Sequence, residues 1–244
     1  MRAILPLLLL ALAAPASALS VDELIERNIE ARGGAKALHA IQSVKMTGAM
    51  NFSGGDFSID LGFSSLAERD AKVRTEASLQ GLTQVSAYDG KDAWRIDPFQ
   101  GRRDPERLSG EDTKGMQLQA DLDGPLLDWK AKGHSVTYLG TEDVDGTKAH
   151  KLKISLKNGD TQFRFLDPDY FLEILVIDQV RRRGVESETE TELGNYEKVA
   201  GVYFPFAMES GPKGGRRGQK ITLTAVEANV DIDDALFAFP VPKS

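Results

Sequence analysis

Apolar and polar residues alternate one by one over most of this chain. The clearest example lies between two glycine-containing turns, where lysines alternate with Leu152, Ile154 and Leu156. Period-two alternation is typical of a strand with one buried and one exposed face. The flanking dipeptides Asp145-Gly146 and Asn158-Gly159 favour tight hairpin turns, because both central residues of a type I′ turn need positive φ. We therefore predict an antiparallel meander over residues 135–178.

The alternation continues on both sides of this meander, over residues 44–96 and 180–229. The stretch 171–177 differs, because apolar residues occupy both of its faces, and we predict that both faces are covered. Pro205 interrupts a later strand pattern. Since proline cannot donate a hydrogen bond to a sheet, this position predicts an edge or a bulge.

Two short helices are predicted ahead of the first strand. Ser20 and Glu23 have the spacing of a capping box, in which each side chain accepts a hydrogen bond from the other's backbone N–H. Gly33-Gly34 interrupts the helix that follows, and a second short helix ends near Ile41. Both helices have one apolar face, so we expect them to pack on the sheet.

Residues 111–130 form the only helical pattern inside the strand-rich region. Ser109 and Asp112 resemble a second capping box, and Gly124-Pro125 should divide the helix into two pieces. Two interpretations remain open for this apolar segment. It is either a lid over the concave face of a curved sheet or an ordinary helix that fills the core.

A curved sheet with a lid would enclose an apolar hollow, and a methionine in the lid would suit loosely specified apolar ligands because methionine repacks easily. Which strand side chains face inward depends on register, since a slip of one residue inverts every side chain. The residues that we expect to line the hollow and its lid are Phe57, Phe63, Trp94, Met116, Leu118, Leu122, Leu126, Trp129, Phe163 and Phe165.

The first residues have the features of an export signal. Arg2 precedes an apolar run, and Ala16-Ser17-Ala18 is a small-x-small cleavage site. We expect residues 1–18 to be a cleaved signal peptide and residues 19–244 to be one periplasmic domain; an uncleaved anchor is the alternative. No later apolar stretch reaches the ~20 residues of a membrane-spanning helix.

Composition narrows the possible functions. The formal net charge of −7 argues against a nucleic-acid-binding protein, which needs a basic surface. The chain has no cysteine, so a lipoprotein-type acyl anchor is not expected. His39, His134 and His150 lack metal-ligand spacing, and no nucleophile or phosphate-binding motif occurs. We therefore expect neither enzymatic activity nor a metal or other cofactor.

Two charged segments stand out near the C-terminal end. Glutamates alternate from Glu186 to Glu192, and basic residues cluster at 181–183 and between Lys213 and Lys220. Alternating glutamates are most often a solvated strand face. The basic clusters fit either a sheet edge that discourages aggregation or a surface for anionic headgroups or a protein partner.

Three segments carry a resemblance to a known family. They are Glu30–Leu38 (EARGGAKAL), Phe165–Leu172 (FLDPDYFL) and Asn195–Pro205 (NYEKVAGVYFP). Together they make nearly all of the mature chain similar to the outer-membrane lipoprotein-sorting proteins of the LolA/LolB-like superfamily. The chain is longer than the dedicated carrier and adds the acidic strand and basic loop. Arg164 is the candidate for a lid-locking arginine.

The resemblance implies a mainly β (α+β) fold, in which helices cover the concave face of a strongly curved open antiparallel sheet, a half-barrel. It also implies a soluble periplasmic protein that binds lipid or acyl chains and carries lipoproteins towards the outer membrane. The alternative function is an envelope-stress sensing or protein-interaction module that uses the sheet edge to bind an envelope partner. The mature chain is expected to have no transmembrane segment.

Overall fold

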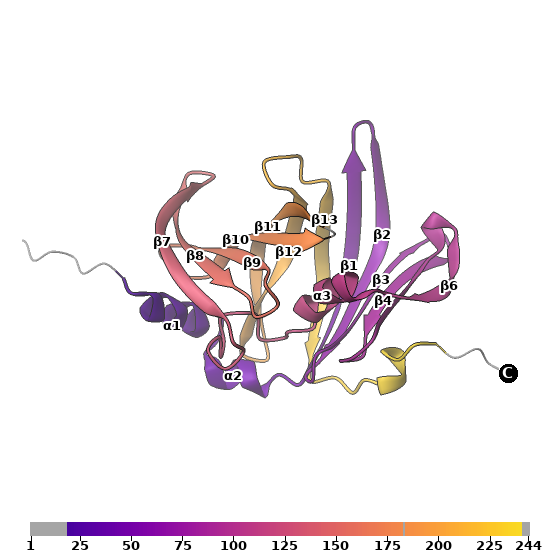
Figure 1. Cartoon of the computed structure of the whole chain (residues 1–244), viewed down its shortest axis with the longest axis horizontal. Helices are drawn as coiled ribbons and strands as arrows, with labels where there is room; N and C mark the ends of the chain where they lie inside the picture. The colour runs from indigo at the N-terminus through magenta and orange to yellow at the C-terminus, as the bar shows by residue number, and fades with distance from the viewer. Residues whose placement is uncertain (1–18, 183, 241–244) are drawn as a thin grey trace, which may run out of the picture.

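The computed structural model describes residues 19–240 except Arg183. The expected signal peptide, residues 1–18, lies outside the described residues. Most of the described chain is strand, with three α-helices and two short 3-10 turns in this part (Figure 1). The helices are α1 (Val21–Ala31), α2 (Ala35–Ala40) and α3 (Gly110–Gln119), and the 3-10 turns are Pro98–Gln100 and Asp234–Leu236.

Thirteen strands form one antiparallel sheet within the described residues. They are β1 (Ser43–Gly54), β2 (Phe57–Glu68), β3 (Lys72–Leu79), β4 (Leu82–Tyr88), β5 (Ala93–Asp97), β6 (Arg102–Arg107), β7 (Ser135–Val144), β8 (Thr147–Ser155), β9 (Thr161–Leu166), β10 (Glu173–Arg182), β11 (Val185–Val199), β12 (Val202–Pro212) and β13 (Gln219–Ala228). The strands from β1 to β6 make one meander and those from β7 to β13 make another, and β1 pairs with β13 at the centre. The open sheet between edges β6 and β7 confirms the predicted mainly β fold class.

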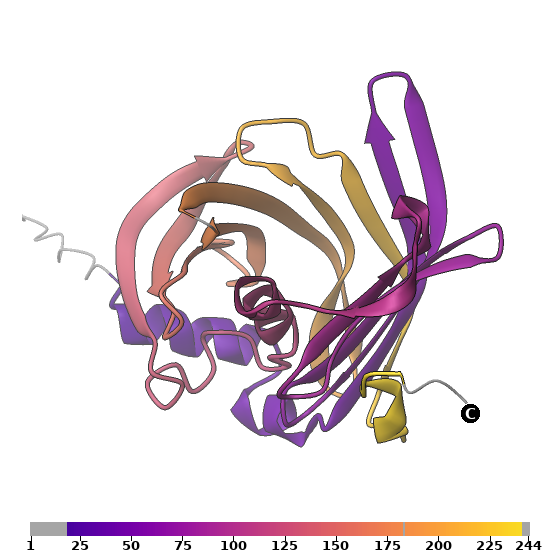
Figure 2. The same cartoon turned by 45° about the vertical axis from the view of Figure 1, so that its right-hand side comes forward.

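The sheet curves strongly, and α3 lies inside the curve (Figure 2). Bulges contribute to this curvature, because an extra residue on one strand bends it. One bulge lies at the centre, where the β1–β13 register shifts between Thr47 and Gly48. A β-carbon at Gly48 would collide with the carbonyl oxygen of Thr222, so only glycine fits this close approach.

Both predicted hairpins are present, but only the first has the predicted type I′ turn. At the β7–β8 turn, Asp145 and Gly146 both have positive φ, 49° and 89°, as a type I′ turn requires. At the β8–β9 turn Gly159 has a positive φ of 91° and Asn158 does not, and the Gly159 N–H donates to the Leu156 carbonyl at 3.0 Å. Pro205 also lies where the sequence predicts, in a part of β12 with a partner on one side. It pairs with Tyr196 of β11, whereas β12 pairs with β13 only from Ala207 to Ser210.

The helix boundaries follow local sequence. The Ser20 hydroxyl accepts a hydrogen bond from the Glu23 N–H at 3.1 Å and starts α1, as the capping box predicts. The helix stops before Gly33, whose φ is 123° and whose missing β-carbon leaves room for the Gly201 carbonyl. This close contact presses the α1–α2 junction against the β11–β12 turn.

The prediction of helix over residues 111–130 is only partly correct. Helix α3 ends at Gln119, and residues 120–134 continue as turns. The Asp121 carboxylate accepts a hydrogen bond from the Asp123 N–H at 3.3 Å, a local contact that competes with helix. Gly124 then adopts a φ of 72°, and Pro125 follows. We call residues 110–134 the covering segment, because it crosses the concave face from β6 to β7 (Figure 2).

Two apolar clusters hold the helices and the covering segment against the sheet. Leu126 packs with Leu24 of α1 and with Leu152 of β8, and all three side chains are fully buried. Leu127 joins Leu38 of α2 and side chains of β1, β12 and β13. Each fully buried leucine stabilises the fold by about 2 kcal/mol relative to an exposed one.

Candidate functional site

An apolar cavity of about 500 Å³ lies on the concave face over the central strands. Its wall comes from both meanders, which meet at the β1–β13 pair, and Leu122 of the covering segment borders it. Prominent apolar wall residues are Val44, Met46, Met50, Phe63, Met208 and Ile221. We call this space the inner cavity. Its volume lies within the range of small-molecule sites, about 300–1,000 Å³.

Two further cavities adjoin the covering segment. A cleft of about 620 Å³, the outer cleft, lies between this segment, the β2–β3 turn and the β8–β9 turn. A polar chamber of about 240 Å³ lies beside α1 and strands β9 and β10. Asp121 and Leu122 border all three spaces. The covering segment is therefore a thin partition between them.

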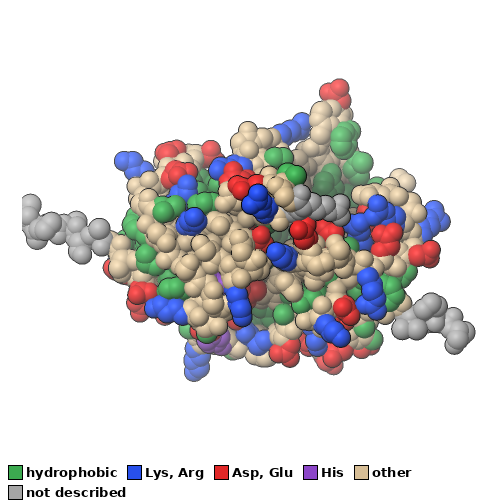
Figure 3. Space-filling model, viewed as in Figure 1, with side chains coloured by type: hydrophobic (Ala, Val, Ile, Leu, Met, Phe, Trp, Pro, Cys, Tyr) green, Lys and Arg blue, Asp and Glu red, His purple; other side chains and the backbone are tan. Residues whose placement is uncertain are grey.

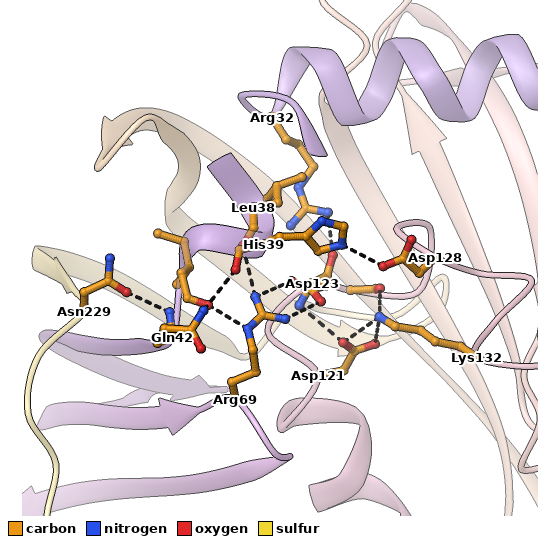
Figure 4. A network of polar contacts seen from close by, with 12 residues as sticks. Arg32, Leu38, His39, Gln42, Arg69, Asp121, Asp123, Asp128, Lys132 and Asn229 are labelled. Atoms are coloured by element: carbon orange, nitrogen blue, oxygen red, sulfur yellow. Dashed lines mark hydrogen bonds and ion pairs between the residues drawn. The ribbon is translucent and has the colours of Figure 1, made fainter. Parts of the chain in front are cut away.

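A partly buried ion pair ties this partition to the sheet. Arg69, at the end of β2, donates two hydrogen bonds to the Asp123 carboxylate at 2.8 and 3.0 Å (Figure 4). It also donates to the carbonyls of Leu38 and Ile41 at 3.0 and 2.9 Å. The hydrogen bonds that Arg69 donates to Asp123 raise the pKa of Arg69. We call the Arg69–Asp123 pair the latch.

Other polar contacts support the latch. Lys132 contacts both carboxylate oxygens of Asp121 at 2.7 Å, and Asp128 contacts the His39 ring at the same distance (Figure 4). Arg32 donates to the Asp123 carbonyl at 2.8 Å. Partly exposed ion pairs of this kind contribute little individually, about 0–1 kcal/mol. The segment around Leu122 is thus held mainly by polar contacts, while Met116 and Leu126 on either side are buried.

Neither a metal site nor a membrane-spanning helix emerges from the described residues. No three histidine, aspartate or glutamate side chains in this part lie close enough together to hold a metal ion. None of the described helices is long and apolar enough to cross a membrane.

Several solved structures share this fold. A LolA superfamily protein from Nitrosomonas europaea has 14% identity and a TM-score of 0.59, with 91% of this chain and 98% of that chain aligned. An outer membrane lipoprotein-sorting protein domain from Vibrio parahaemolyticus has 15% identity and a TM-score of 0.59, over 87% and 95% of the chains. The fold is that of the LolA superfamily. A DUF1329 family protein from Desulfovibrio piger is also similar, with 14% identity and a TM-score of 0.61 over 89% and 97%.

These likenesses confirm the predicted resemblance at the level of the fold. At 14–15% identity they do not extend to ligand or activity. No family model matches the sequence, and no curated protein matches it either.

Three of the expected ligand-binding residues border the cavities of this LolA-like fold. Phe63 lies in the wall of the inner cavity, and Leu122 borders all three spaces. Leu118 borders the outer cleft and the polar chamber. Leu118 and Leu122 belong to the covering segment, and Phe63 lies on strand β2.

Three expected lid residues are instead packed in the core. Met116 is buried against Val73 and Tyr88, and Leu126 lies in the cluster with Leu24 of α1. Trp129 packs partly against the same cluster and carries the Lys130 ammonium 4.8 Å from its ring centre. The covering segment thus combines both interpretations, since its ends fill the core and its middle borders the cavities.

Four expected aromatic residues do not line the hollow, which corrects the sequence analysis. Phe57 lies at the tip of the β1–β2 hairpin and is 57% exposed. Trp94 packs on Phe239 and donates to the Phe237 carbonyl at 2.7 Å. Its neighbour Ala93 packs against α3, so Trp94 lies on the opposite face of β5. Phe163 and Phe165 alternate with Gln162 and Arg164, which border the polar chamber, so both phenylalanines point to the other face.

The sequence analysis also missed residues that build the site. Met46, Met50 and Met208 line the inner cavity. They belong to the alternating strand pattern, but the sequence analysis did not select them because it assumed that aromatic residues line the hollow. Arg69, rather than Arg164, holds the covering segment. In the sequence, Arg69 is recognisable only as a basic residue between the end of a strand and a turn. In the structure, Asp70 in that turn has a φ of 74°.

Proposed function

We propose that this chain binds the acyl chains of lipids in its inner cavity and acts as a periplasmic carrier, with acylated lipoproteins among its cargo. The inner cavity is the observation that carries this proposal. Its wall is mainly apolar and contains three methionines, and the covering segment borders it. Such a surface suits flexible alkyl chains better than rigid, polar substrates.

The energetics of loading are favourable. Each methylene group buried in the cavity contributes about 0.8 kcal/mol. Loading would displace the side chain of Leu122, which packs partly against the cluster of Val44, Val202 and Leu223. Since polar contacts hold the middle of the covering segment, a long alkyl chain would offset the cost of moving it.

The comparisons and the first residues support this proposal. The Vibrio parahaemolyticus protein with the same fold is described as an outer membrane lipoprotein-sorting protein domain. Residues 1–18, with their apolar run and small-residue cleavage site, would direct the chain to the periplasm.

The test is native mass spectrometry of protein purified from the periplasm without detergent. We expect discrete added masses that disappear after solvent extraction and return when a fatty acid is added. Leu122→Asp should abolish this binding, because it places a charge at the border of the inner cavity, the outer cleft and the polar chamber. Leu139→Asp is the matched control, since Leu139 is 49% exposed on edge strand β7. A bare mass that does not shift with acyl ligands would reject the proposal.

A second candidate is a protein-interaction module without cargo. The β1–β2 hairpin projects from the sheet and exposes hydrophobic side chains (Figures 1 and 3). Phe52, Phe57 and Ile59 are 38%, 57% and 42% exposed there. A bare mass together with capture of an envelope protein that is lost in Phe57→Ser would favour this function over lipid binding.

A further inference from the structure

The polar chamber bears on which amphiphiles the inner cavity would accept. It adjoins the inner cavity, and the two spaces share Arg32, Asp121, Leu122 and Glu173 as wall residues. An alkyl chain in the inner cavity would therefore end close to charged groups. The chemistry of these groups determines which end of an amphiphile fits.

Both carboxylates of the chamber wall, Asp121 and Glu173, have a cationic partner, whereas one of its two arginines, Arg32, has none in the described part of the chain. Arg164 lies 3.4 Å from Glu173, and Lys132 lies 2.7 Å from Asp121, so both carboxylates have partners. Arg32 has no carboxylate partner among the described residues. Among the described residues, the Arg32 side chain donates one hydrogen bond, to the main-chain carbonyl of Asp123, towards which it points in Figure 4.

The chamber also has spare hydrogen-bond donors. The Nε of Arg164 is buried and has no partner within the part of the chain that the structure describes. The Nδ1 of His134 accepts a hydrogen bond from the Lys157 N–H at 3.2 Å, which leaves Nε2 as the protonated nitrogen of the neutral ring. Burial lowers the pKa of His134, so the ring is neutral at pH 7. His134 therefore brings a ring N–H donor to the chamber wall, and an anionic ligand would supply an acceptor for it.

These groups are held in place before any ligand arrives. Arg32 caps the end of α1, and its carbonyl accepts a hydrogen bond from the Tyr203 N–H at 2.9 Å. The Tyr196 hydroxyl donates to the Glu173 carbonyl at 2.7 Å, and burial raises the pKa of Tyr196, which keeps it protonated. Fixed donors lose little freedom on binding, which favours a specific headgroup.

We propose that the polar chamber binds the anionic headgroup, a carboxylate or a phosphate, of an amphiphile whose acyl chain lies in the inner cavity. Arg32 is the charge partner of this headgroup, and Arg164 adds a second positive charge to the same wall. This inference rests on the proposed function, because the acyl chain must occupy the inner cavity.

The test compares ligands with one chain and different heads. Isothermal titration calorimetry at pH 8 measures binding of oleate, 1-oleoyl-lysophosphatidate, oleyl alcohol and inorganic phosphate to the extracted wild-type protein. We expect at least one of the two anionic amphiphiles to bind about tenfold or more tightly than oleyl alcohol, as a charge-assisted hydrogen bond would provide. Whether oleate or lysophosphatidate binds more tightly identifies the headgroup.

Variants of chamber residues test whether the chamber causes the preference for anionic amphiphiles over oleyl alcohol. Arg32→Gln should bring the anionic amphiphiles and oleyl alcohol within about twofold of each other, with the affinity for the alcohol unchanged. Arg27→Gln is the matched control on the same helix, because Arg27 is exposed and borders none of the cavities described above. If Arg32→Gln fails to fold by circular dichroism, the double variant R164Q/E173Q tests the chamber, since it removes a charge pair together. It should reduce the preference as well.

The two proposals fail in different ways. Equal binding of oleate, lysophosphatidate and oleyl alcohol to the wild type would overturn the headgroup site and leave acyl binding intact. Equal affinities for inorganic phosphate and lysophosphatidate would also overturn it, because the acyl chain would then play no part. Failure of all three amphiphiles to bind would overturn both proposals.

Discussion

Arg69 and Asp123 decide whether the covering segment stays in place. Their side chains are 29% and 11% exposed, so the pair lies at the boundary between a surface ion pair and a buried one. Burial makes removal of one partner costly, because the other charge is left unpaired. Partial exposure of the arginine reduces that cost through solvent screening.

Arg69→Gln should lower the free energy of unfolding by about 2 kcal/mol, because it leaves the buried Asp123 carboxylate without its guanidinium. Asp123→Asn should have a similar effect, and the double variant should lose less than the sum of the two. Urea unfolding of the four proteins measures this coupling. Strict additivity would show that the two side chains do not stabilise each other.

At the scale of elements, the acidic strand and the basic loop prove to be partners. Strand β11 carries the alternating glutamates, and the β12–β13 loop folds over it. Lys213 contacts Glu188 at 2.9 Å, and Arg217 contacts Glu190 and Glu192 at 3.1 and 2.7 Å. The basic loop therefore neutralises its own strand, which weakens the argument for either segment as a surface for anionic lipids.

Arg217→Gln should lower the free energy of unfolding by about 1 kcal/mol, because Glu190 is only 12% exposed and loses its ion pair. The loop over residues 213–218 should also become easier to cleave. Thermal unfolding and limited proteolysis measure the two effects. Arg216→Gln, at an exposed neighbouring residue, is the control and should change neither quantity.

His150, on strand β8, should make the stability of the fold depend on pH. His150 contacts the Tyr138 hydroxyl at 2.9 Å and stacks on Phe171. Burial, helped by the positive charge of Arg27, lowers its pKa below the usual value, and burial acts in the same direction on His134. In the unfolded chain both histidines titrate near pH 6.5, so the unfolded state takes up protons first as the pH falls.

Their contribution to stability should be complete above about pH 6.5 and should be lost as the pH falls from there through the lower pKa values of the folded state. We expect the melting temperature to decrease between pH 7.5 and pH 5.5. In the double variant H134N/H150N the decrease should be smaller. An equal decrease in the variant would assign the effect to other groups.

At the scale of the whole molecule, the two meanders and the covering segment together enclose the inner cavity. The central strands pair along most of their length, with nine partners between β1 and β13 and a continuous β1–β2 ladder. Residues 120–134 have turns instead of a ladder. Local opening should therefore begin in the covering segment, which has fewer backbone hydrogen bonds to protect it.

Hydrogen exchange tests this division. In the ligand-free protein, backbone amides of residues 120–124 should exchange faster than those of β1 and β13. Loading with the amphiphile that binds most tightly should accelerate exchange at 120–124, because Leu122 leaves its contacts, and should slow exchange in β1. Unchanged exchange at 120–124 on loading would show that the segment does not move.

The sequence by itself was sufficient for the features that depend on near neighbours. The type I′ turn at Asp145-Gly146, the start of α1 at Ser20 and the burial of both faces of β10 at Leu175, Val176 and Ile177 each follow from a few adjacent residues. Local backbone preferences and period-two alternation act over this short range, so they can be recognised without a fold. The mainly β class follows from them.

Only the tertiary structure decided which residues meet. Phe163 and Phe165 point away from the cavities, because strand register assigns the two faces, and register is set by partners far along the chain. The latch joins residues 54 positions apart, and Arg217 meets Glu190 across 27. Such contacts arise from the packing of whole strands and turns, and no local pattern encodes them. The candidate site depends on them.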